Sequence, residues 1–135
     1  MKLFRNPIVF IILSLVFFQS CKTDSELTME RGNYFYSNGS YSEASSEFKK
    51  IILKYSDIGS LNNNEIEILA HAYQQLALSQ AQLASQASTV NESIIDYKNA
   101  LENSKKAESL AIKEGKRSEY RKTRLGIENK LKLIQ

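Results

Sequence analysis

The sequence predicts an all-α protein of antiparallel helical hairpins, with about two hairpin repeats followed by a C-terminal capping helix. Downstream of the N-terminal segment, apolar residues recur at intervals of three and four, the spacing of one helix face. Helix breakers are scarce, because the single proline is Pro7 and only five residues are glycine. No window alternates with a period of two, so we expect no β-sheet.

The first two predicted helices begin at capping-box patterns, in which Ser, Thr or Asn precedes Glu by three residues. The first helix begins at the Thr-x-x-Glu of residues 23–26 and ends at about residue 37, because Asn38-Gly39 favours a left-handed turn. The second begins at the Ser-x-x-Glu of residues 40–43 and ends near Tyr55.

Three longer helices are expected after a polar, glycine-containing loop at residues 57–63. The first two of them begin at further capping boxes, and Gly115 is expected to end the second. Their predicted ranges are 62–86, 89–113 and 117–133. Short connections make consecutive helices antiparallel neighbours. Close helix contact is favoured by small residues on the apolar faces, namely Gly32, Ala44, Ala70 and Ala100.

The first 20 residues have the charge and hydropathy order of a secretory signal peptide. Lys2 and Arg5 precede an apolar segment, residues 7–18, that is too short to span a bilayer core of about 30 Å. Ser20 directly before Cys21 resembles a lipobox, a signal in which the cysteine is acylated and becomes the first residue of the mature protein. The alternative is an ordinary signal peptide followed by a free thiol, although an exposed thiol is a liability in an oxidising compartment.

We therefore expect a lipoprotein signal peptide at residues 1–20, a lipidated tether at 21–25 and a helical domain at 26–135. Lys22 stands where an Asp would retain an enterobacterial lipoprotein at the inner membrane, which favours the outer membrane. Removal of the signal peptide leaves 16 basic and 15 acidic side chains. This balance does not indicate a nucleic-acid partner.

The first predicted hairpin has a characteristic set of small and large apolar positions, namely Gly32, Phe35, Gly39, Tyr41, Ala44, Phe48 and Ile51. With this set the hairpin resembles the tetratricopeptide repeat (TPR), a helix-turn-helix unit of 34 residues. A second unit begins with the Leu-Ala-His-Ala-Tyr of residues 69–73, and its helices would both be longer than usual. The resemblance covers about residues 25–113 and implies stacked hairpins.

The segment at residues 41–55 ends in Phe48-x-x-Ile51-Ile52-x-x-Tyr55. With this ending it is also similar to the first repeats of the BamD-like lipoproteins, which belong to the outer-membrane β-barrel assembly machinery. The similarity implies a periplasm-facing scaffold that binds another envelope protein. The alternatives are a structural subunit of another envelope complex, with no free binding groove, and an enzyme or enzyme inhibitor.

TPR units bind partner segments in a concave groove lined by the first helix of each hairpin. The alternative is that these positions are solvated helix faces, or that Tyr36 packs within its hairpin. Transferred by repeat position, the groove would present Met29, Asn33, Tyr36, Ser37, Glu67, His71 and Gln74.

Catalytic and cofactor motifs are missing from the sequence. His71 is the single histidine, and it has no second histidine and no suitable cysteine with which to share a metal ion. We therefore expect no enzyme activity, cofactor, metal or small-molecule substrate. The basic segment at residues 113–132 is either a solvated last helix or a docking site for an acidic partner or anionic lipid headgroups.

Overall fold

The computed structural model describes residues 22–135, which form five α-helices and one short 3-10 helix. No strand occurs among these residues, and the predicted all-α fold is confirmed. The predicted signal peptide at 1–20 and lipid-bearing Cys21 lie outside the described part. In chain order the elements are α2 (Asp24–Ser37), α3 (Tyr41–Lys54), η1 (Ile58–Ser60), α4 (Asn63–Gln86), α5 (Val90–Leu110) and α6 (Glu114–Ile134).

Three of the four predicted capping boxes are confirmed. The side chains of Thr23, Asn62 and Thr89 each accept a hydrogen bond from the backbone N–H three residues on, and the carboxylate of the glutamate there accepts one from the backbone N–H of the capping residue. The prediction for Ser40 is wrong, because its side chain makes no capping bond. Gly39 adopts a φ of 78°, and the Ser40 N–H donates instead to the Phe35 carbonyl at 2.9 Å. Ser40 therefore belongs to the turn that ends α2.

The boundary between the last two helices also differs from the prediction. The helix α5 ends at Leu110, and Gly115 lies inside the first turn of α6 rather than ending α5. The guanidinium of Arg117 donates to the Ala111 carbonyl at 2.8 Å, which satisfies a backbone acceptor freed where α5 ends. Packing does not require a glycine at position 115, because a Cβ there would contact nothing within 4 Å.

Two further differences concern segments expected to be irregular. The polar loop after α3 contains the 3-10 helix η1. The chain becomes helical at Asp24, as the capping box at residues 23–26 predicts, so Asp24 and Ser25 at the end of the predicted tether belong to α2. Ser25 is buried and its hydroxyl lies 2.8 Å from the hydroxyl of Tyr55 on α3. The first turn of α2 is therefore part of the packed domain.

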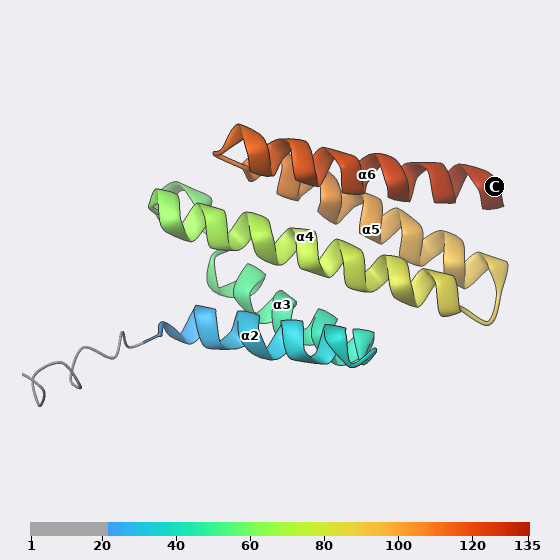
Figure 1. Cartoon of the computed structure of the whole chain (residues 1–135), viewed down its shortest axis with the longest axis horizontal. Helices are drawn as coiled ribbons and strands as arrows, with labels where there is room; N and C mark the ends of the chain where they lie inside the picture. The colour runs from blue at the N-terminus through green and yellow to red at the C-terminus, as the bar shows by residue number, and fades with distance from the viewer. Residues whose placement is uncertain (1–21) are drawn as a thin grey trace, which may run out of the picture.

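The helices form two antiparallel hairpins, α2–α3 and α4–α5, and α6 packs along the second (Figure 1). Each helix packs mainly against the next one in the chain, while α2 and α6 each touch α4 only lightly. In Figure 1, α2, α4 and α6 lie toward the viewer and α3 and α5 lie behind them. The first helices of the hairpins therefore share one face with α6.

Small residues bring the helices of each hairpin close together, as predicted. All four predicted contact residues, Gly32, Ala44, Ala70 and Ala100, are buried. A Cβ at Gly32 would lie 2.8 Å from Cζ of Phe48 and closer still to Cε1, so only glycine fits against this ring. The α4–α5 hairpin is instead packed through a row of alanines with Tyr97.

Candidate binding groove

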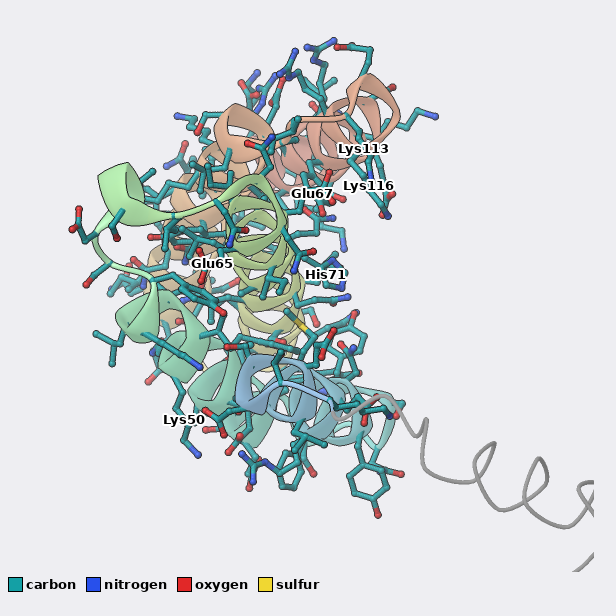
Figure 2. All side chains as sticks on the ribbon, turned by 90° about the vertical axis from the view of Figure 1, so that its left-hand side faces the viewer. Lys50, Glu65, Glu67, His71, Lys113 and Lys116 are labelled. Carbon is teal, nitrogen blue, oxygen red and sulfur yellow. The ribbon has the colours of Figure 1, made fainter. Side chains whose placement is uncertain are left out.

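A cavity of about 440 Å³ lies between α2, α4 and the beginning of α6. Figure 2 looks at the end of the molecule where it opens, with Glu67 and His71 on α4, and with Lys113 at the N-cap of α6 and Lys116 in its first turn. The cavity has the size of a pocket for a small ligand or for a few side chains of a partner. It is lined by Glu26, Met29, Glu30, Asn64, Glu67, Ile68, Ala70, His71, Ala111, Ile112, Lys113, Lys116 and Tyr120.

The apolar lining comes from all three sides of the groove. Met29 is half-buried on α2, Ile68 is half-buried on α4, and Tyr120 is buried on α6. Burial, assisted by the negative charges of Glu119 and Glu67, raises the pKa of the Tyr120 hydroxyl to about 12. This hydroxyl therefore stays protonated at neutral pH and serves the groove as a neutral group.

The two outer walls of the groove differ in charge. The α2 wall carries Glu26 and Glu30, whereas the α6 wall carries Lys113 and Lys116. Glu67 on α4 pairs with Lys113 at 3.2 Å and so links the central helix to the basic wall. This partly exposed pair contributes little to stability. The groove therefore has one acidic side, on α2, and one basic side, on α6.

His71 is half-buried in the lining of the groove, with its Nε2 3.5 Å from Nε2 of Gln75. Burial lowers its pKa below the usual 6.5, and the nearby positive charge of Lys116 lowers it further, against a weaker opposing effect of Glu119. The imidazole is therefore neutral at pH 7. No three His, Cys, Asp or Glu side chains within residues 22–135 are placed to hold a metal ion together.

Three of the seven predicted groove residues line the cavity, namely Met29, Glu67 and His71. The other four do not. Asn33 and Ser37 are exposed further along α2, and the Ser37 hydroxyl donates to the Asn33 carbonyl at 3.0 Å. Tyr36 packs edge-on against Tyr41 within its own hairpin, with ring centroids 5.2 Å apart.

Gln74 is buried between α4 and α6 rather than exposed to a partner. Its amide Nε2 donates to the Thr123 hydroxyl at 2.7 Å, while its buried Oε1 has no hydrogen-bond partner within the described chain. The predicted groove position is thus occupied by a link between helices.

The seven predicted groove residues do not include the wall formed by the start of α6. Lys113 was expected to end the helix at 89–113, Lys116 to lie in the connection after it, and Tyr120 to belong to the last helix. The basic segment at 113–132 was predicted only as a solvated helix or as a docking site in its own right. The order of the helices could have predicted this wall. A helix that follows two hairpins takes the place of the first helix of a third hairpin, and first helices line the groove. The missed α2 residues, Glu26 and Glu30, flank Met29 on the same helix face.

Comparison with protein-family models, curated proteins and solved structures gives no match.

Proposed function

We propose that this chain is a lipid-anchored envelope protein that acts as a scaffold and holds a segment of another envelope protein in the groove between α2, α4 and α6. The groove itself is the observation that carries the proposal. Its exposed surface is mostly apolar, its walls bear opposite charges, and it is built from α2, α4, the start of α6 and the short α5–α6 connection. Such a surface combines apolar contact with charge pairing, and the pairing selects partner and orientation.

The TPR resemblance supports the same function. Gly32 contacts the ring of Phe48, and Ala44, Phe48 and Ile51 are buried at 0–1% exposure, as the repeat's packing positions require. The helices α2, α4 and α6 line the groove in the order of successive first helices. The finer proposal is an accessory of outer-membrane β-barrel assembly, anchored through Cys21 at the outer membrane and facing the periplasm.

The test is affinity capture of the tagged, lipidated protein from detergent-solubilised membranes, followed by mass spectrometry. Recovery of the barrel-forming subunit of the assembly machinery is the expected result. Recovery of a different envelope complex would contradict the accessory role but retain the scaffold. Capture of nothing above background would contradict the scaffold itself.

A charge-inverting pair of variants assigns the capture to the groove. Lys113→Glu with Lys116→Glu reverses the α6 wall, and both residues are exposed, so we expect the fold to be retained. Lys49→Glu with Lys98→Glu is the matched control, because these exposed residues lie outside the groove and change the net charge equally. Capture should be lost in the first protein and kept in the second, whereas equal capture would place the partner elsewhere.

The alternative is a structural subunit whose helices are covered on several sides. It is favoured by large aliphatic side chains that project into solvent, with exposed fractions of 74% at Leu53, 63% at Val90 and 85% at Leu133. Single exposed residues of this kind are common on soluble proteins. Substitution of all three by serine distinguishes the functions, since it would abolish capture of a surrounding complex and leave capture through the groove unchanged.

A further inference from the structure

Only Lys22 and Thr23 separate Cys21 from the first helical residue, Asp24. Both residues are held by α2, because Thr23 forms the capping box with Glu26 and the Lys22 ammonium pairs with Glu30. Even fully extended, the three residue steps from Cys21 to Asp24 span at most about 11 Å. The headgroup layer on each side of a bilayer is about 5–8 Å thick. A lipid anchor at Cys21 would therefore keep the start of α2 next to the membrane surface.

The two connections between the hairpins and α6 lie at this same end of the molecule. Figure 1 shows that the start of α2, the α3–α4 connection and the α5–α6 connection are on one side, opposite the tight turns within the hairpins. Each connection exposes an isoleucine, with exposed fractions of 47% at Ile58 and 43% at Ile112. Ile112 also lines the groove, so an apolar surface continues from the groove to the end of the bundle.

The basic side chains at this end are paired with acidic ones. The ion pairs are Lys22–Glu30, Lys54–Asp24 at 3.5 Å, Lys113–Glu67 at 3.2 Å, Lys116–Glu119 at 2.9 Å and Arg117–Glu114 at 3.2 Å. A surface of this kind has no excess positive charge to attract anionic headgroups. Contact with a membrane would rest on the anchor and the apolar side chains, so it would need no anionic lipid and would resist salt.

We propose that the end of the bundle carrying Ile58 and Ile112 rests on the lipid bilayer, with these two side chains in the headgroup layer. This inference rests on the proposed lipid anchor at Cys21. The helices then stand upright on the membrane, and the groove opens at the membrane surface. The segment that the groove holds would accordingly be one that lies close to the membrane in the partner protein.

The sequence allows a clean test, because Cys21 is the single cysteine. Acylation consumes its thiol, so one introduced cysteine is the only site for a thiol-reactive environment-sensitive dye. Lipidated Ile58→Cys and Ile112→Cys proteins are labelled and reconstituted in phosphatidylcholine vesicles that contain a quencher-bearing lipid. Val90→Cys and Ile95→Cys, at the opposite end with exposed fractions of 63% and 58%, are the matched controls.

Quenching is expected to be several times stronger at positions 58 and 112 than at 90 and 95, with a blue-shifted emission that persists in high salt. Equal quenching at both ends would overturn the proposal, and so would stronger quenching at positions 90 and 95. Intact mass separates this failure from a failure of the anchor. An acylated protein with equal quenching contradicts only the orientation, whereas a protein with unmodified Cys21 contradicts the anchor and the orientation together.

Discussion

The two hairpins are packed by different means. In α2–α3, one large side chain, Phe48, is fully buried against the backbone of Gly32. In α4–α5, the buried contact is a row of small residues along α4, Ala77, Ala81 and Ala84, that faces Tyr97 and Ala100 on α5. The first hairpin has 14 residues in each helix, whereas the second has 24 and 21.

This difference shows two ways to set the register of a helical hairpin. A ring that fits only over a glycine allows one relative position of the two helices. A row of alanines allows close approach along the whole length but specifies the position weakly. Polar links supply what the alanines lack, since Asn103 donates to Gln80 at 2.7 Å and the Ser93 hydroxyl donates to the Ala84 carbonyl at 2.8 Å.

The largest expected effect is therefore in the first hairpin. Phe48→Ala should lower the free energy of unfolding by about 3–5 kcal/mol, because it removes a fully buried ring and leaves a cavity. Ala100→Gly, at a position of 0% exposure in the second hairpin, should cost only about 1 kcal/mol. Urea unfolding of the mature protein measures both.

Leu53→Ala on α3 is the control for the Phe48 variant, because its side chain is 74% exposed and its loss should change stability by less than about 0.5 kcal/mol. Equal losses for Phe48→Ala and Ala100→Gly would show that the first hairpin does not depend on one side chain.

The next effect tests the glycine side of the same contact. Gly32→Ala should destabilise by about 1–3 kcal/mol, because the new methyl group overlaps the Phe48 ring in a core that has no room to move. Gly126→Ala on α6 is the same chemical change in open space and should stabilise by about 0.5–1 kcal/mol. The two variants should change the melting temperature in opposite directions. A stabilising Gly32→Ala would contradict the idea that the Gly32–Phe48 contact fixes the register of the first hairpin.

Much of the fold follows from local chemistry that the sequence displays. The capping boxes at Thr23, Asn62 and Thr89 depend on residues three positions apart, and the glycine turn at Gly39 depends on one residue. Ser40 shows the limit, since the same capping pattern is overridden when the preceding turn holds its backbone. Gly115 shows the same limit of local patterns, because a glycine can lie within a helix as well as at its end.

The candidate site was less predictable, because it depends on how distant helices lie. Of the residues that repeat position assigns to a partner groove, Met29, Glu67 and His71 line the cavity. Gln74 instead faces α6. The position of α6 over α4 depends on packing that involves Thr123, Ile127 and Leu131, and no local pattern reports it.

A smaller effect tests whether the first turn of α2 belongs to the first hairpin. Tyr55→Phe removes the hydroxyl that lies 2.8 Å from the Ser25 hydroxyl and leaves Ser25, which is 1% exposed, without that partner. We expect a loss of about 1 kcal/mol in urea unfolding. Tyr34→Phe, at 66% exposure on α2, should change nothing measurable. If the two variants are equally stable, the first turn of α2 does not contribute to the packing of the first hairpin and belongs to the tether.

The smallest expected effect lies where the two hairpins meet, at His71. Its pKa is lowered in the folded protein, mainly by burial, so below about pH 6.5 the unfolded chain binds a proton that the folded chain does not. The free energy of unfolding should therefore be highest, as far as His71 is concerned, above that pH, and it should fall as the pH drops toward the pKa of the folded state. His71→Gln lacks the titrating group, so the native protein should lose melting temperature relative to this variant between about pH 7.5 and pH 5.5. The free energy of unfolding should change with pH by well below the about 1.4 kcal/mol per pH unit that one proton allows.

Parallel melting curves for the native protein and His71→Gln would contradict a lowered pKa and would mean that the imidazole is hydrated in the groove. A steeper fall in the variant would mean that folding raises the pKa of His71 instead.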